Sequence, residues 1–257
     1  MLERRLKTIQ EHLFARGVSS IEELVHITQS SPATVRRDLV KLETDGVIER
    51  THGGARLAES SNLEVAFGLR ESQNLEIKRA IGRAAHALLK PGSTVLMDAG
   101  TTVLQLAKAI RLEPLPLTVI TNGLALAQEL VNVSGVEVIL LGGKLHGDNL
   151  SSIGTYTEKL LEEFWCDQLF LGATAISQED NLATLDAGEA SINRKMLERT
   201  KHSILLADSS KFGHNAPYRV SSLARISQII SDSGLNPSWI KHLEKLAVHF
   251  QLADFNN

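Results

Sequence analysis

The sequence has few of the features that mark secreted, disulfide-stabilised or membrane-spanning proteins. Cys166 is its single cysteine, so no disulfide can form within the chain. No basic segment followed by an apolar stretch opens it, and its apolar runs fall far short of the ~20 residues that a membrane-spanning helix needs. We therefore expect a cytoplasmic protein.

The chain also lacks a strong positive charge. Its net charge is -3, and residues 1–57 hold nine Lys/Arg against eight Asp/Glu. A protein that binds DNA by general electrostatic attraction would carry a basic patch. Any DNA binding must therefore depend on the placement of a few charged side chains.

Motifs of metal and nucleotide chemistry are missing as well. The nine histidines are scattered, without an H-E-x-x-H motif or a paired Cys/His spacing. The sequence contains neither a Walker loop nor G-x-G-x-x-G. It predicts neither a bound metal nor a cofactor.

The first 57 residues predict three short helices and a hairpin. Leucine and isoleucine recur at helical spacing from Leu2 until Gly17, a residue that suits a helix C-terminus. Ser20 begins a capping-box pattern for a second helix that ends near Gln29. We expect a third helix from Ser31-Pro32 to about residue 43, and two strands at 47–52 and 55–57 around a Gly-Gly turn.

The third predicted helix has an apolar face and a polar face. Val35, Leu39 and Leu42 fall on one side, which we expect to be buried. The opposite side carries arginine and threonine, whose groups suit base edges and phosphates in a major groove. A solvated pair of surface arginines is the alternative. The candidate DNA contacts are Ser31, Thr34, Arg36, Arg37 and Lys41 of the helix, and Arg50, His52 and Arg56 of the hairpin.

The remaining residues alternate apolar strands with helical patterns. After a connecting segment over 58–75, we expect a larger domain over 76–257. The alternation favours an α/β fold with a doubly wound, mostly parallel sheet. The predicted strands are 94–98, 118–121, 136–141, 169–171, 203–208 and 228–231.

Polar side chains follow three of these predicted strands. Asp98 precedes Gly100-Thr101-Thr102 at a helix start, where free N–H groups and hydroxyls suit a phosphate. Thr121-Asn122 ends the next strand, and Lys211 lies in A-D-S-S-K-F-G, residues 207–213. Each cluster judged alone could be a cap or a solvated turn. Three clusters together favour an anion-binding crevice.

Residues 31–55, S-P-A-T-V-R-R-D-L-V-K-L-E-T-D-G-V-I-E-R-T-H-G-G-A, resemble the DNA-binding signature of the DeoR family of bacterial repressors. The resemblance implies a winged helix-turn-helix over 1–57, with Thr34, Arg36 and Arg37 on the recognition helix and the wing over 50–56. Asp38 lies beside the arginines, and we expect it to orient Arg37 or to serve helix structure.

The motifs D-A-G-T-T, T-N, L-L-G-G, F-L-G-A and A-D-S-S-K-F-G resemble that family's sensor domain in the same order. The resemblance implies a fold similar to ribose 5-phosphate isomerase and a phosphorylated sugar or polyol effector. It implies a site of Asp98, Gly100, Thr101, Thr102, Thr121, Asn122, Asp208 and Lys211, with Glu189 as a weaker candidate.

Two segments depart from the family pattern. Asn181-Leu182-Ala183-Thr184 replaces a glycine-rich G-x-T-T, and Thr174-Ala175-Ile176 replaces a glycine-rich loop. We therefore expect a difference from the family at the end of the crevice that contacts the non-phosphate part of the ligand. The effector itself is not predicted.

The alternative function is a sugar-phosphate isomerase or deaminase. Such an enzyme needs a general base beside its substrate. In similar isomerases the base lies in the region occupied here by residues 191–194, which holds no acid, although Glu189 is one turn away. We expect a regulator of a sugar or polyol catabolic operon, a repressor by resemblance and not an enzyme. It should be a homo-oligomer, because one head offers too little DNA contact.

Overall fold

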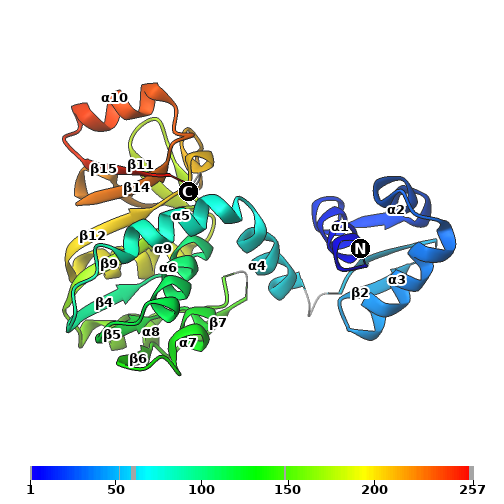
Figure 1. Cartoon of the computed structure of the whole chain (residues 1–257), viewed down its shortest axis with the longest axis horizontal. Coiled ribbons are helices and arrows are strands. Elements are labelled where there is room, and N and C mark those ends of the chain that lie inside the picture. The colour runs from blue at the N-terminus through cyan, green and yellow to red at the C-terminus, as the bar shows by residue number, and fades with distance from the viewer. Residues whose placement is uncertain (1, 52, 59–61, 148, 255–257) are drawn as a thin grey trace. The chain divides into compact units, whose positions relative to one another are not determined.

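The computed structural model describes residues 2–51, 53–58, 62–147 and 149–254. The chain divides into two compact units, which we call the head (Met1–Ser72) and the body (Gln73–Asn257). Both are labelled by element in Figure 1. Among the described residues, no helix is long and apolar enough to cross a membrane.

The head has the three predicted helices and the predicted hairpin. A further short strand, which the sequence did not indicate, pairs with the hairpin to give an antiparallel sheet of order β1-β3-β2. The elements are α1 (Leu2–Arg16), β1 (Val18–Ser20), α2 (Ile21–Thr28), α3 (Pro32–Thr44), β2 (Ile48–Thr51), β3 (Gly54–Leu57) and α4 (Asn62–Ser72). Helix α4 occupies most of the segment that we expected to connect the two domains.

Caps fix where the head helices begin. Ser20 Oγ accepts from the Glu23 backbone N–H at 3.2 Å, and the Glu23 carboxylate accepts from the Ser20 N–H at 3.0 Å. This is the predicted capping box. At α3 the Ser31 side chain accepts from the Thr34 N–H, and Pro32 takes the first helical position, where no N–H is required. The predicted apolar face of α3 is fully buried in the head core.

The structure corrects the predicted role of Asp38. Its side chain is buried, and its carboxylate accepts two hydrogen bonds from the guanidinium of Arg5 on α1, one of them at 3.0 Å from Nη2 to Oδ1. The hydrogen bond to Asp38 raises the pKa of Arg5. Asp38 therefore joins α3 to α1 and does not orient Arg37. Arg5 lies 33 residues away in sequence, so no local pattern indicated this pair.

The body is built on a seven-stranded sheet of order β15-β14-β12-β9-β4-β5-β6. Every pairing in it is parallel. All six predicted strands are present, and β15 is an additional edge strand. The strands are β4 (Ser93–Met97), β5 (Leu117–Thr121), β6 (Val136–Leu140), β9 (Cys166–Gly172), β12 (Thr200–Leu206), β14 (Gln228–Asp232) and β15 (His249–Ala253).

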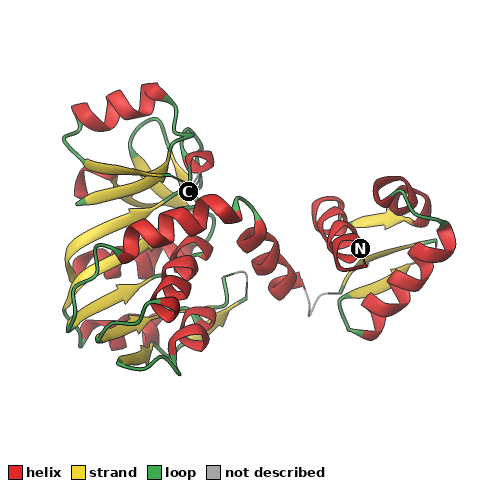
Figure 2. Cartoon of the chain, viewed as in Figure 1, coloured by secondary structure: helices red, strands yellow, loops and turns green. Residues whose placement is uncertain are grey.

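Helices lie on both faces of this sheet (Figure 2), as expected for a doubly wound fold. They are α5 (Leu75–His86), α6 (Thr101–Leu112), α7 (Leu124–Leu130), α8 (Thr155–Glu162), α9 (Ala187–Glu198) and α10 (Pro237–Lys245), with 3-10 turns η1 (Ser209–Lys211) and η2 (Leu223–Arg225).

Two small antiparallel sheets were not predicted. One is the hairpin of β7 (Lys144–His146) and β8 (Ser151–Ile153). The other joins β10 (Ala175–Ile176), β11 (Asn181–Thr184) and β13 (Tyr218–Ser222). Their strands have two to five residues, too short for a clear alternating pattern.

The strand order places a switch point at the centre of the sheet. From β4 the chain proceeds to β5 and β6 on one side, and from β9 it proceeds to β12, β14 and β15 on the other. Adjacent strands whose connections leave in opposite directions open a crevice at their carboxyl ends. The crevice therefore lies beyond β4 and β9.

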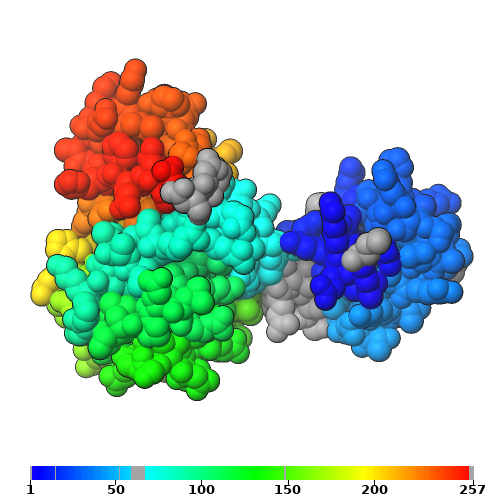
Figure 3. Space-filling view, in the orientation of Figure 1, coloured from blue at the N-terminus to red at the C-terminus, as the bar shows by residue number. Residues whose placement is uncertain are grey.

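Helices α5 and α6, which lie side by side (cyan and green in Figure 3), approach closely at Gly82. A Cβ at this position would be 2.7 Å from the backbone carbon of Gln105. Backbone cannot move aside as a flexible side chain can. The contact between the two helices therefore requires glycine.

We predict that Gly82→Ala destabilises the body by about 1–3 kcal/mol through overpacking, although alanine is the better helix former. Chemical denaturation should measure the loss. Gly68→Ala, in helix α4 of the head, is the control for the effect of alanine in a helix without overpacking, because a Cβ there would have no heavy atom within 4 Å. It should be neutral or stabilising. Equal behaviour of the two variants would contradict the close contact.

Candidate functional site

The outward side of α3 carries several of the predicted DNA contacts. Arg36, Arg37 and Lys41 are exposed, while Val35 and Leu39 on the opposite side are fully buried. At about 100° per residue, the centre of the outward side is a stripe of four residues: Ala33, Arg37, Val40 and Thr44. This side presents positive charge around a small apolar centre.

Val40 is a residue of this stripe that the sequence reasoning missed. Its side chain is 52% exposed. Valine has a lower helix propensity than residues such as alanine or lysine. An apolar side chain in a major groove can contact the methyl group of thymine. Its place one turn after Arg37 was the available signal.

Ser31 and Thr34 hold the start of α3. Ser31 Oγ accepts from the Thr34 N–H at 3.2 Å, and the two hydroxyl oxygens are 2.8 Å apart. Both residues thus lie at the helix N-terminus, where unpaired N–H groups suit an anion. Their hydroxyls already take part in the cap.

The structure does not bring the predicted wing arginines together. Arg50 lies opposite Ala55 in the hairpin and Arg56 lies opposite Glu49, so the two arginines project from opposite faces. The Arg56 guanidinium pairs with Glu49, with 2.6 Å between Nη2 and Oε2. His52, the third predicted wing contact, lies outside the described residues.

Asp98 lies at the carboxyl end of β4, at the switch point of the sheet. Its Oδ2 atom accepts from the Gly172 N–H at 2.8 Å and so joins the ends of β4 and β9. A Cβ at Gly172 would lie 3.0 Å from that oxygen, and one at Gly100 would lie 3.1 Å away. Glycine at both positions lets the carboxylate fit between the strands.

Burial raises the pKa of Asp98 from 3.8 to about 6, while its hydrogen bond from Gly172 lowers the pKa and the charge of Glu189 adds a further increase. Glu189 is therefore near enough for the two carboxylates to repel each other. Two partly desolvated carboxylates at one crevice suit a ligand that donates several hydroxyl hydrogens.

Glu189 is held by residues from three segments. Its Oε2 accepts from Thr184 Oγ1 at 2.8 Å, and its Oε1 is contacted by Asn149 and lies 3.3 Å from His146 Nδ1. Thr184 supplies the one threonine hydroxyl of the family's G-x-T-T motif that this chain retains. No three His, Cys, Asp or Glu side chains of the described residues form a group suited to a metal ion.

Lys78 is the second residue that the sequence reasoning missed. Its side chain is buried, and its Nζ donates to Thr101 Oγ1 at 3.1 Å. Thr101 begins α6, Gly100 is its N-cap, and Thr102 beside them is buried. The available signal was its spacing. Lys78 lies three residues before Ile81 and four before Gly82, on the buried side of α5. Buried lysines are rare unless paired.

The polar residues after β5 and β12 mainly hold loops. Thr121 Oγ1 accepts from the Gly123 N–H at 3.0 Å, and Asn122 Nδ2 donates to the Ser152 carbonyl at 3.1 Å. Asp208 Oδ1 accepts from Asn74 Nδ2 at 3.2 Å and from the Ser210 N–H at 3.1 Å. These bonds position the rim of the crevice. Lys211 lies half-buried in η1, directly beyond.

The head and body together define a two-domain transcription regulator, with a helix-turn-helix unit followed by a sensor unit. Residues 5–61 match the DeoR-like helix-turn-helix domain, and residues 73–233 match the DeoR C terminal sensor domain. The chain belongs to the DeoR family. The resemblance found in the sequence is confirmed.

Relatives of known name match along nearly the whole chain. It is 33% identical over 252 residues to the transcriptional repressor GlcR of Bacillus subtilis (strain 168), covering 98% of this chain and 96% of that protein. It is 33% identical over 230 residues to the glycerol-3-phosphate regulon repressor of Escherichia coli (strain K12), covering 90% of each. The matched families and these names are those of regulators.

Among solved structures, ribose 5-phosphate isomerase A from Methanocaldococcus jannaschii aligns with a TM-score of 0.40 at 18% identity, covering 54% of this chain and 55% of that chain.

We predict that Asp98→Asn stabilises the body at pH 8, and that it does so by a smaller amount at pH 5. Asp98 has a higher pKa when folded than its ordinary 3.8, so its contribution to stability is lost progressively as pH rises from 3.8 to about 6. The full loss is about 3 kcal/mol above pH 7, and asparagine can still accept from the Gly172 N–H. Urea denaturation at both pH values measures this.

The control is Glu113→Gln, which removes an exposed carboxylate from the same unit. It should leave the difference in unfolding free energy between pH 5 and pH 8 unchanged. A pH-independent effect of Asp98→Asn would contradict the buried, raised-pKa carboxylate.

Proposed function

We propose that this protein is a repressor of a sugar or polyol catabolic operon, released or recruited by a phosphorylated sugar or polyol that binds the body. The observation that carries the proposal is the pairing of the buried Lys78 with Thr101 at the start of α6, directly after the buried carboxylate of Asp98. The name of one relative, the glycerol-3-phosphate regulon repressor, supports a polyol-phosphate setting.

The two ends of the crevice suit the two ends of such a ligand. A helix N-terminus with a threonine hydroxyl and a buried ammonium group is a phosphate site. Lys211 adds a second positive charge from η1. Asp98 and Glu189 accept hydrogen bonds from sugar hydroxyls, and Thr121, Asn122 and Asp208 position the loops around them.

The head would read operator DNA through the outward side of α3. Arg37 and Val40 face the base edges in this proposal, while Arg36, Lys41 and the helix N-terminus at Ser31 contact phosphates. Arg50 and Arg56 would contact the backbone on either side of the wing. Two linked heads on a repeated site gain affinity through effective concentration, so we propose a homo-oligomer.

Effector and DNA are coupled if the ligand binds two arrangements of the oligomer unequally. No catalytic step is needed for this. Glu189 is the acid one turn from the region where similar isomerases carry their base, and its carboxylate is already engaged by Thr184 and Asn149. A purified protein that interconverts ribose 5-phosphate at an ordinary enzymatic rate would favour the enzyme instead.

We predict that Arg37→Ala weakens operator binding without unfolding the head. A lost bidentate contact with a base costs about 1–3 kcal/mol, and Arg37 is exposed, so the core is untouched. Binding to an operator selected from random DNA should be measured at fixed salt. Arg225→Ala, which removes an exposed arginine from the body, is the control. Wild-type affinity in the Arg37 variant would refute this placement of α3.

We predict that a sugar phosphate alters operator binding at concentrations at least tenfold lower than the matching free sugar. A charge-assisted hydrogen bond to phosphate is worth about 1.5–3 kcal/mol. Titration of the protein–operator complex with glycerol and glycerol 3-phosphate, and with ribose and ribose 5-phosphate, measures this difference.

The variants Thr101→Val, Lys78→Met and Lys211→Ala should each reduce the response to the phosphorylated member. Thr118→Val, at the opposite end of β5 from the crevice, should not. A full response in all three variants would remove the phosphate site from this account.

A further inference from the structure

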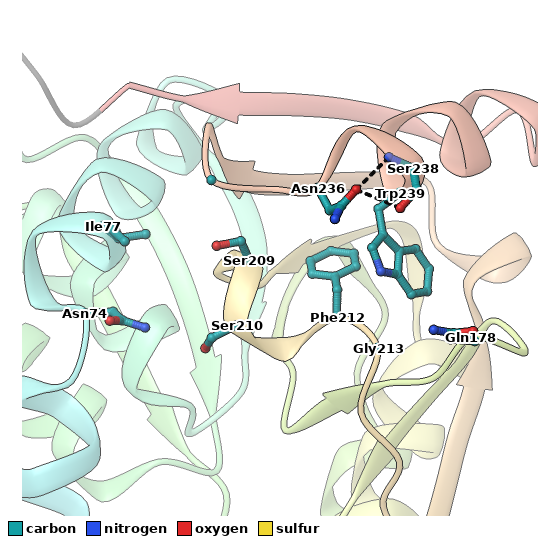
Figure 4. Close-up of a pocket in the computed structure, with 11 residues that line it drawn as sticks. Asn74, Ile77, Gln178, Ser209, Ser210, Phe212, Gly213, Asn236, Ser238 and Trp239 are labelled. Carbon is teal, nitrogen blue, oxygen red and sulfur yellow. Dashed lines mark hydrogen bonds between the residues drawn. The ribbon is translucent and has the colours of Figure 1, made fainter.

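A hollow lies beyond the carboxyl ends of β12 and β14, beside η1. Its volume is about 540 Å³. The first turn of α5 forms one wall with Asn74 and Ile77, and Phe212, Trp239 and Gln178 form the other (Figure 4). Its size is that of a small-molecule site.

The lining has a specific chemical character. Three amide side chains, three serines and two aromatic rings contribute to it, and no charged side chain does so among the described residues. Amides and hydroxyls both donate and accept hydrogen bonds, as sugar hydroxyls do. Aromatic rings add a flat apolar surface beside these polar groups. The described lining therefore contains no positively charged side chain that could pair with a phosphate.

The aromatic wall is fixed before any ligand arrives. Trp239 meets Phe212 edge to face, with ring centroids 5.3 Å apart, and meets His242 at 5.5 Å. His242 Nε2 is in turn 2.6 Å from Asp180 Oδ1. A preorganised wall reduces the entropy lost on binding.

The polar lining is positioned as well. Asp232 accepts from the Ser209 N–H and hydroxyl, at 2.6 and 3.0 Å, and fixes the loop after β12. Asn236 accepts through Oδ1 from the N–H and hydroxyl of Ser238, at 2.9 and 2.8 Å. Its amide nitrogen is turned toward the hollow (Figure 4).

We propose that this hollow is a second ligand site, which takes a neutral, hydroxyl-rich ring such as an unphosphorylated sugar. Its lining residues differ from those of the proposed phosphate site, although both sites include residues from the start of α5 and from the loop between Asp208 and Phe212. Asn74 contributes to the hollow and donates to Asp208, so a ligand here contacts the same loop that carries Lys211. The body would then respond to a free sugar and to a sugar phosphate at different places.

The chain supplies its own reporter for this site. Of its two tryptophans, Trp165 is 57% exposed and Trp239 lines the hollow. In a Trp165→Phe protein, all tryptophan emission comes from Trp239. We expect a saturable change in that emission with D-glucose, D-galactose or D-ribose at millimolar concentration.

Two lining variants and one distant variant test the assignment. Asn236→Ser keeps a residue that caps α10 well but removes the amide, and Gln178→Ala removes an exposed amide. Each should weaken sugar binding about three- to tenfold, the effect of one hydrogen bond. Thr101→Val should weaken the effect of ribose 5-phosphate on operator binding. It should leave the change in Trp239 emission with the free sugar intact.

No saturable change with any of the three sugars would overturn the proposal. So would wild-type affinity in both lining variants, or a response to adenosine with none to the sugars. Loss of both responses in Thr101→Val would show a single shared site and also overturn it. The phosphate site can fail independently, if ribose 5-phosphate has no effect while the free sugar still binds at Trp239.

Discussion

The body depends on one hydrogen bond at the centre of its sheet, from the Gly172 N–H to the Asp98 carboxylate. It fixes the separation of β4 and β9 at the point where the chain connections diverge. The carboxylate is buried there at a cost, which its pKa of about 6 expresses. Glycine at positions 100 and 172 makes room for it, and every other group of the crevice is positioned relative to these two strand ends.

This constraint separates the polar residues of the crevice into two kinds. Thr121, Asn122 and Asp208 bind backbone groups and neighbouring amides, and they keep loops in place. Lys78 and Glu189 instead bring charge to the crevice from helices α5 and α9. Apart from Asp98, the polar residues that follow the strands therefore hold loops, while the buried charges on the covering helices are the candidates for ligand contact.

The head follows the same logic on a smaller scale. Asp38 and Arg5 tie α3 to α1, so the buried side of α3 is set and its outward side is free to present Arg37 and Val40. The wing shows why local pattern is insufficient. Arg50 and Arg56 look equivalent in the sequence, yet hairpin register sends them to opposite faces.

Local signals in the sequence were enough for the class of fold. Apolar periodicity, the Ser20 and Ser31 caps and the alternation of strands and helices gave the three head helices, the hairpin and six of the seven strands of the main sheet, because these features act over a few residues. Tertiary structure decided what depends on contacts between distant segments. It paired Asp38 with Arg5 and Lys78 with Thr101. It also brought Glu189 near Asp98. The hollow beside Trp239 is lined by residues from segments as distant as α5 and α10. Such contacts are set by strand order and helix packing, and no short stretch of sequence contains them.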